Sequence, residues 1–281
     1  MKRLLLALSL VAAVGATAAD TATTTSPSTS TTTLSNLWNK IKESPVSVSW
    51  LNDTYIDSKG ADGFTSDNYV YLNYKIDKYH KLTLKPMFRT SHDKTQKGQG
   101  DYHTELSNTE FRFTRSKILT EEKHGVNMSF LLRNYFVNDE ARKTGYDSYH
   151  YLYTSFSKTW GKFTLGSNPY ILQYNRNSGD FKRDKLLSIG VVPTYSFTDN
   201  FSVTPSFIWY SYKDNVKDAA SNTQGSDNIL LSASADYSIG ALSVSLYFES
   251  WIVQSNDGYA TGVHQWWNKG AVGTTLYYTL F

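Results

Sequence analysis

The sequence predicts an all-β fold: a closed antiparallel up-and-down barrel of about twelve strands that spans a membrane. Three observations support this prediction. The first is the hairpin pattern of residues 227–254, which has one apolar face and one mostly polar face. The second is the recurrence of such segments along the chain, joined by links that are alternately short and long. The third is an N-terminal export signal.

The hairpin at 227–254 shows the strand period most clearly. In its first arm, apolar side chains from Ile229 to Ile239 alternate with mostly polar ones, and the alternation resumes from Leu242 to Phe248. The two-residue loop Gly240-Ala241 would place Ile239 opposite Leu242 on one face. The apolar stripe therefore continues through both arms, as in a pair of strands with one apolar face.

The N-terminus predicts export. Met1-Lys2-Arg3 precedes the apolar run 4–14, and Ala16-Thr17-Ala18 follows it, so residues 1–18 have the three parts of a signal peptide. The alternative is an N-terminal anchor helix, but the run is too short to cross a bilayer as a helix. Residues 19–33 are rich in Thr and Ser and predict a flexible leader.

A short amphipathic helix is predicted at 34–44, where Leu34, Leu37, Trp38 and Ile41 have helical spacing. Two roles stay open for it, a strut outside the barrel or a plug inside the pore.

Composition excludes several function classes. The chain has 28 Lys and Arg against 25 Asp and Glu, and removal of Lys2 and Arg3 with the signal peptide leaves it nearly neutral, so no nucleic-acid partner is expected. Cysteine is absent, which excludes disulfides and thiolate metal sites, and no cofactor or metal motif is visible. The 21 Tyr, 14 Phe and 7 Trp in a chain of negative mean hydropathy suit half-apolar strands.

The barrel is predicted to occupy residues 45–281. Its strand-like segments are 45–57, 67–77, 81–92, 104–116, 125–137, 147–159, 162–174, 184–197, 201–213, 227–239, 241–254 and 265–281. An even number of strands with short links at one end and long polar links at the other is the layout of a bacterial outer-membrane barrel. The facing of the first, sixth and seventh segments is ambiguous from the sequence.

Aromatic residues fall at two levels of the predicted strands, as in the girdles of such barrels. Near the short links they are Trp160, Phe163, Phe197, Phe201 and Tyr237. Near the long links they are Trp209, Trp251, Trp266 and Trp267, although Trp251 lies on the polar face of its strand.

The C-terminus ends Tyr277-Tyr278-Thr279-Leu280-Phe281. It resembles the assembly signal of Gram-negative outer-membrane β-barrels, which closes on a terminal Phe; this family often has an aromatic residue where Thr279 stands. The resemblance implies that the barrel-assembly machinery recognises the strand ending in Phe281. It also implies an integral outer-membrane protein in contact with lipid and lipopolysaccharide. Both predicted termini fall at the end with the short links, which in this layout faces the periplasm.

The face opposite the apolar one carries the candidate site. Its charged residues are the cations Lys75, Lys85, Arg89, Arg112 and Arg133 and the carboxylates Glu110, Asp236 and Glu249. Charges at membrane depth must face water or each other, so they are predicted to line a hydrated lumen. The function this predicts is a diffusion channel for small hydrophilic solutes or ions, with a basic wall that gives a modest anion preference. The alternative is an ion-pair network that closes the lumen.

The basic arc is similar to that of twelve-stranded bacterial channels for acidic oligosaccharides. An outer-membrane phospholipase is the enzyme alternative, but His103 and Ser107 are four residues apart on a strand, about 13 Å, too far for proton transfer. A structural or adhesive barrel acting through loops such as 93–103 and 213–227 is the third possibility. These loops carry mixed charge without an apolar anchor, and no catalytic residue is predicted.

Overall fold

The computed structural model describes residues 44–57, 63–93, 103–143, 145–177, 183–214, 225–254 and 270–280. The predicted signal peptide and leader, the predicted helix apart from Ser44, and the terminal Phe281 lie outside these residues.

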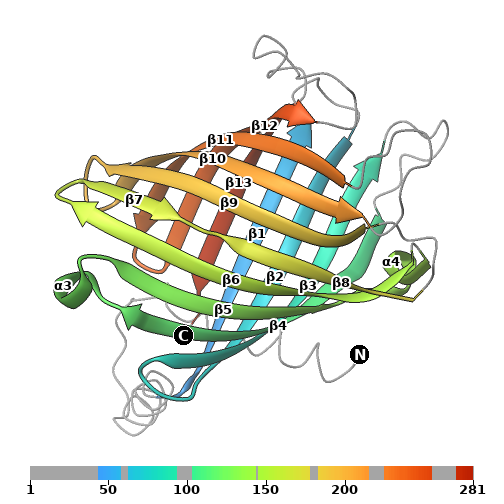
Figure 1. Cartoon of the computed structure of the whole chain (residues 1–281), viewed down its shortest axis with the longest axis horizontal. Coiled ribbons are helices and arrows are strands. Elements are labelled where there is room, and N and C mark those ends of the chain that lie inside the picture. The colour runs from blue at the N-terminus through green and yellow to red at the C-terminus, as the bar shows by residue number, and fades with distance from the viewer. Residues whose placement is uncertain are drawn as a thin grey trace, which may run out of the picture. The chain divides into compact units, whose positions relative to one another are not determined.

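The described chain forms one antiparallel sheet. Its strands are β1 (Val46–Asp57), β2 (Gly63–Lys75), β3 (His80–Asp93), β4 (His103–Leu119), β5 (Asn127–Phe136), β6 (Tyr146–Trp160), β7 (Phe163–Ser167), β8 (Tyr170–Arg176), β9 (Arg183–Ser196), β10 (Phe201–Asp214), β11 (Gly225–Ile239), β12 (Leu242–Gln254) and β13 (Gly270–Thr279). Figure 1 shows them wrapping around a common axis. These bounds agree with the predicted segments to within a few residues at most ends.

β7 and β8 are two pieces of one strand. Both pair with β6 on one side and with β9 on the other. Asn168 and Pro169 separate them, because proline has no N–H to donate to a sheet ladder. The Pro169 carbonyl still accepts a hydrogen bond from the Thr154 N–H, 3.0 Å away. The thirteen pieces therefore fill twelve places in the barrel.

The sheet is closed. β1 pairs with β13 from Ser49↔Thr279 to Asp57↔Ala271, and β9 pairs with β10. Each strand position thus has a hydrogen-bonded neighbour on both sides, which removes every edge, as a backbone in a membrane requires. The predicted closed twelve-stranded barrel is confirmed.

Among the described residues, two short helices lie in the links between strands. Helix α3 (Glu121–His124) follows β4 and ends at Gly125, whose φ of 74° is left-handed, and α4 (Asp139–Lys143) follows β5. They lie at opposite ends of the barrel, α3 with the short turns and α4 with the long links (Figure 1). In the part of the chain that the structure describes, no helix has the length and apolarity needed to cross a membrane.

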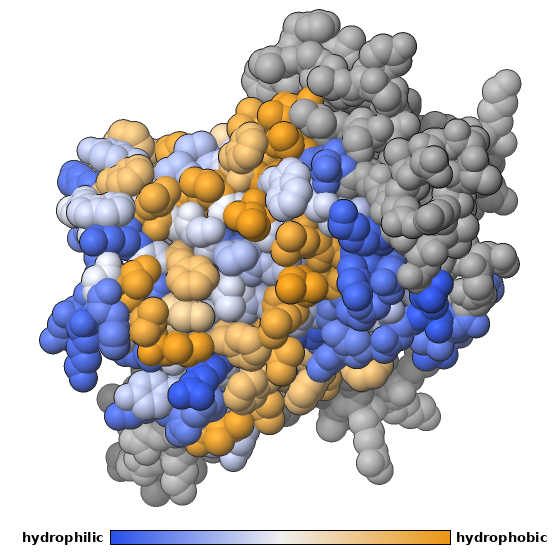
Figure 2. Space-filling view, in the orientation of Figure 1, coloured by the Kyte–Doolittle hydropathy of each residue, from blue (hydrophilic) through white to orange (hydrophobic). Residues whose placement is uncertain are grey.

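The outer face of the barrel is apolar, as the alternation predicted. On β9, Leu187, Ile189 and Val191 are exposed, and on β3 the side chain of Leu84 is 44% exposed while its neighbours Thr83 and Lys85 are buried. Figure 2 shows apolar residues gathered in a band across the middle of the visible face, with hydrophilic residues toward both ends of the barrel. This is the surface expected against acyl chains.

Aromatic residues concentrate on the outer face at the short-turn end. Trp160 stacks near Phe163, with ring centroids 6.1 Å apart, and Phe197 stacks near Phe201 at 5.5 Å. Trp251, the ambiguous member of the other girdle, packs against the ring of Tyr210 at 5.3 Å. The β11–β12 register shifts between Ile229 and Leu230, and Trp251, opposite the buried Leu230, shares the inward face with Glu249.

The turn between β2 and β3 is built around Asp77. Its Oδ1 accepts hydrogen bonds from the backbone N–H groups of Tyr79 at 2.7 Å and His80 at 2.8 Å, and its Oδ2 lies 2.8 Å from His80 Nδ1. The bond with the His80 ring and the two backbone bonds lower the pKa of Asp77 from 3.8 to about 2.

We expect Asp77→Ala to weaken the barrel against unfolding above about pH 4 but not near pH 2. A carboxylate whose pKa is lowered by folding stabilises the folded state above its unfolded pKa, and this contribution is lost as the pH falls from 3.8 to about 2. Denaturant midpoints of both proteins between pH 7 and pH 2 check this. Asp77→Asn, which keeps an acceptor without charge, is the control. If the denaturant midpoints of the wild type and Asp77→Ala differ by the same amount at all pH values, the charged carboxylate of Asp77 is not the source of the stabilisation.

Candidate functional site

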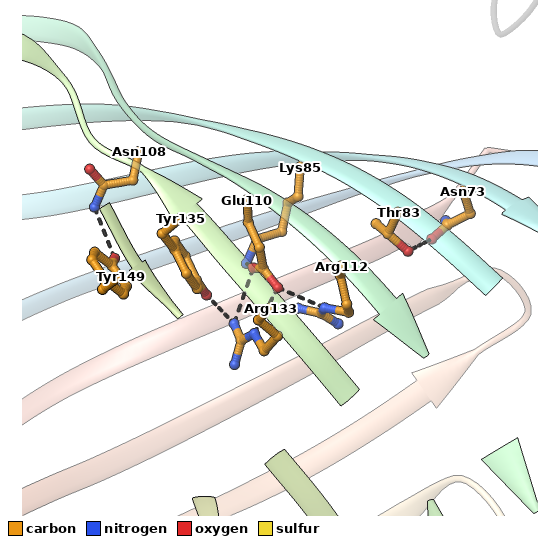
Figure 3. Close-up of polar contacts among 9 residues, drawn as sticks. All are labelled: Asn73, Thr83, Lys85, Asn108, Glu110, Arg112, Arg133, Tyr135 and Tyr149. Carbon is orange, nitrogen blue, oxygen red and sulfur yellow. Dashed lines mark hydrogen bonds and ion pairs between the residues drawn. The ribbon is translucent and has the colours of Figure 1, made fainter. Parts of the chain in front are cut away.

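The inner wall of β3, β4 and β5 holds a cluster of charges centred on Glu110. Its Oε1 lies 2.7 Å from Arg112 Nε and 2.7 Å from Arg133 Nε, and its Oε2 lies 2.7 Å from Lys85 Nζ. A fourth bond comes from Arg133 Nη2 to Oε2 at 3.1 Å. Figure 3 shows the three cations converging on this carboxylate. We call Lys85, Glu110, Arg112 and Arg133 the basic cluster.

Strand register brings these four residues together. Lys85 is the direct neighbour of Glu110 across the β3–β4 pair, and Arg112 is the direct neighbour of Arg133 across the β4–β5 pair. Glu110 and Arg112 are two apart on β4, so they project to one face. The β3–β4 register shifts between Pro86 and Phe88, which follow Lys85 along β3, and Lys85 remains paired with Glu110.

The basic cluster is largely withdrawn from solvent. The side chain of Glu110 is 1% exposed and that of Lys85 is 8% exposed, while those of Arg112 and Arg133 are 19% and 21% exposed. Charge-assisted bonds from three partners compensate the desolvation of the single carboxylate. Three cations share one anion, so the cluster keeps an excess of two positive charges.

Tyrosine rings surround the cations. Lys85 Nζ lies 4.4 Å from the ring centre of Tyr69, and the Arg133 guanidinium carbon lies 5.2 Å from Tyr135 and 5.3 Å from Tyr151. Cation–π attraction adds to the ion pairs where water is excluded. The Arg133 Nη2 atom also donates to the Tyr135 hydroxyl.

The tyrosines continue along the wall over β5, β6 and β8 as one contiguous set. Its members are Tyr135, Tyr146, Tyr149, Tyr151, Tyr153, Tyr170 and Tyr174. Tyr135 and Tyr149 are stacked with centroids 4.5 Å apart, and Asn108 donates to the Tyr149 hydroxyl at 3.2 Å (Figure 3). This tyrosine cluster was missed from the sequence, because tyrosine suits either face of a strand and the facing of the sixth and seventh segments was ambiguous.

Arg89 belongs to a second ion pair. Its Nε and Nη2 atoms bond to the two oxygens of Asp67 at 2.8 and 2.9 Å. Asp67 is also the register neighbour of Asp53, which accepts bonds from the Tyr247 and Thr275 hydroxyls at 3.0 Å. Sequence reasoning missed both aspartates, although Asp67 shares the odd-numbered face of β2 with Lys75, which was a usable signal.

The remaining predicted site residues lie apart from the basic cluster. Lys75 is exposed at the short-turn end, as the register neighbour of Lys81. Asp236 accepts a bond from the Ser234 hydroxyl at 2.9 Å, and Glu249 is the register neighbour of Ser232. Of the three predicted carboxylates, Glu110 alone lies among the cations of the basic cluster, whereas Asp236 and Glu249 lie on β11 and β12.

The polar contacts of His103 and His150 are made with residues other than Ser107. His103 is exposed, with Nε2 3.6 Å from a Glu105 oxygen. His150 bonds to Asn134 at 2.5 Å and to Asn175 at 2.6 Å. Within the described parts of the chain, no group of three or more His, Asp or Glu side chains is placed to hold a metal ion.

Comparison with solved structures finds similar outer-membrane proteins. The chain is similar to the COG4313 outer membrane channel from Pseudomonas putida F1, with a TM-score of 0.55 and 8% identity over 84% of this chain and 96% of that one. It is also similar to the NanC porin (TM-score 0.47, 10% identity, 82% and 97% covered) and to OmpT of Vibrio cholerae (0.41, 11%, 83% and 97%). No family model and no curated protein matches the chain. The first of these likenesses shows the fold, a closed antiparallel β-barrel.

Proposed function

We propose that this barrel is a passive outer-membrane channel for small hydrophilic solutes and ions, with a modest preference for anions. The observation that carries the proposal is the basic cluster: three cations share one carboxylate on the inner wall of a closed barrel. A positive wall in a confined, hydrated passage raises the local concentration of anions. A protein of the same fold is an outer membrane channel, which agrees with this role.

The anion preference should come from β3–β5 rather than from all five predicted cations. Asp67 neutralises Arg89 through two bonds, and Lys75 stands exposed at the barrel end. No catalytic step is part of the proposal. We also propose that the short-turn end, where β1 begins and β13 ends, faces the periplasm, because outer-membrane barrels place their short turns there.

Single-channel recording in planar bilayers tests the proposed function. We expect discrete conductance steps and, under a KCl gradient, a reversal potential on the anion-selective side that moves toward zero as salt screens the wall. Arg112→Gln removes half of the excess charge and should reduce the anion preference by a measurable fraction. Arg115→Gln is the matched control, since Arg115 lies on the same strand but is exposed on the outer face with Phe111.

The absence of conductance steps from correctly folded protein would overturn the channel role. Equal shifts for Arg112→Gln and Arg115→Gln would leave the channel role intact but remove the basic cluster as the source of selectivity. Hydrolysis of lipid by the purified protein would favour the phospholipase alternative.

A further inference from the structure

The pairing of Arg112 with Arg133 is unusual for a sheet. Like charges directly opposite each other on neighbouring strands are destabilising. Here the two side chains are register neighbours, and both Nε atoms bond to the same oxygen of Glu110 at 2.7 Å. Glu110 therefore holds the two guanidinium groups in one place, close together and with fixed orientation.

Glu110 has no capacity left to neutralise its partners further. It accepts four bonds, from Lys85, from Arg112 and twice from Arg133, and its side chain is 1% exposed. A carboxylate accepts about four hydrogen bonds in all, so its lone pairs are used. The excess of two positive charges stays with the cations.

Several N–H donors of the two arginines are still open. Arg112 uses only Nε, so its Nη1 and Nη2 have no hydrogen-bond partner among the described residues, and neither does Nη1 of Arg133. These two side chains are about a fifth exposed, whereas Lys85 and Glu110 are enclosed behind them. The unused donors belong to the part of the basic cluster that solvent reaches.

The tyrosines restrict how a ligand can approach. Tyr135 and Tyr151 lie 5.2 and 5.3 Å from the Arg133 guanidinium carbon, and Tyr71 lies 6.0 Å from that of Arg112. A cation–π contact leaves the N–H groups of a guanidinium available to a ligand. A guanidinium edge fits the oxygens of a phosphate or carboxylate group bidentately.

We propose that Arg112 and Arg133 form a binding site for one compact dianion of the phosphate-monoester type. Glu110 is the positioning residue that holds the two arginine side chains in the lumen wall. Two positive charges and at least three free N–H donors match a terminal phosphate group, which carries nearly two negative charges and three acceptor oxygens. A monoanion neutralises only one of the two excess positive charges of the basic cluster. The site makes phosphorylated small solutes the preferred class of passenger; this role, unlike the binding itself, rests on the proposed channel function.

Binding is tested with the purified full chain in detergent, by isothermal titration at pH 8 and constant ionic strength. The probes are methyl phosphate, a dianion, and dimethyl phosphate, its monoanionic counterpart. We expect saturable binding of methyl phosphate that is at least tenfold tighter than that of dimethyl phosphate. Arg112→Gln should weaken methyl phosphate binding about tenfold, the loss expected for a charge-assisted contact.

Two further variants separate the site from general charge and from misfolding. Arg112→Lys keeps the positive charge beside Glu110 but loses the planar, bidentate guanidinium group. We expect this variant to fold and to bind methyl phosphate with an affinity between those of the wild type and Arg112→Gln. Arg115→Gln should bind like the wild type. Equal affinity for the two probes, or unchanged affinity in folded Arg112→Gln, would overturn the site.

Bilayer recordings distinguish failure of the site from failure of the channel. If both hold, methyl phosphate reduces the chloride current with a saturation midpoint that matches the titration. If methyl phosphate binds saturably but the protein shows no conductance, the channel role is wrong and the binding site stands. If the conductance changes only linearly with methyl phosphate concentration and the titration shows no heat of binding, the proposed site is wrong and the channel role stands.

Discussion

Glu110→Gln is expected to lower the free energy of unfolding by about 3–5 kcal/mol, the usual cost of removing one partner from a buried ion pair. The substitution leaves Lys85, Arg112 and Arg133 close together without their shared carboxylate. Glutamine keeps the size and one acceptor oxygen, so the loss measures charge rather than volume. Urea unfolding of the barrel in lipid vesicles, followed by tryptophan fluorescence, measures the change.

Asp236→Asn is the matched control for Glu110→Gln. Among the described contacts Asp236 accepts a bond from Ser234 and has no cationic partner, so we expect a change within about 1 kcal/mol. The double variant Glu110→Gln with Lys85→Met should recover part of the loss, because one of the uncompensated charges is gone. A wild-type unfolding midpoint for Glu110→Gln would show that water, and not the carboxylate, stabilises the three cations.

Leu231→Arg should cost about 2–4 kcal/mol, the penalty for a cation on the lipid face near the bilayer midplane. Leu231 is exposed on the outer face halfway along β11, beside Phe207 on β10. Its neighbour Ser232 lies at the same depth on the inner face, where its register neighbour on β12 is Glu249. Ser232→Arg is therefore expected to change stability by less than about 1 kcal/mol.

The comparison of these two arginine variants tests the membrane orientation of the barrel wall. Unfolding free energies measured in the same vesicles give the difference directly. If Ser232→Arg destabilises as much as Leu231→Arg, the two faces do not divide between lipid and water, and the transmembrane arrangement is wrong. A difference that vanishes in detergent micelles but persists in vesicles would identify the bilayer as its source.

The local pattern was sufficient for the strands and for the outer face. Leu187, Ile189 and Val191 alternate with smaller or polar residues, and all three are exposed on the outer face as predicted. A period of two assigns each side chain to a face without knowledge of any neighbour, so it survives errors of a residue or two at strand ends. The closure of the sheet followed from the even strand count and the alternating links.

The candidate site depended on register, which the sequence does not reveal. The sequence placed Lys85, Glu110, Arg112 and Arg133 on one face but could not say that three of them meet at the fourth. That outcome requires Lys85 to stand opposite Glu110 and Arg112 opposite Arg133. A shift of two residues would keep every side chain on its face and change every partner.

The sequence by itself therefore determined the strands, their two faces and the barrel class, because these properties repeat every two residues along a single segment. The tertiary structure alone decided that Glu110 lies among the cations, that Asp67 neutralises Arg89, and that seven tyrosines form one cluster inside the wall. These contacts join residues on different strands, so they depend on how each pair of strands is aligned by hydrogen bonds and by the bulge near Pro86.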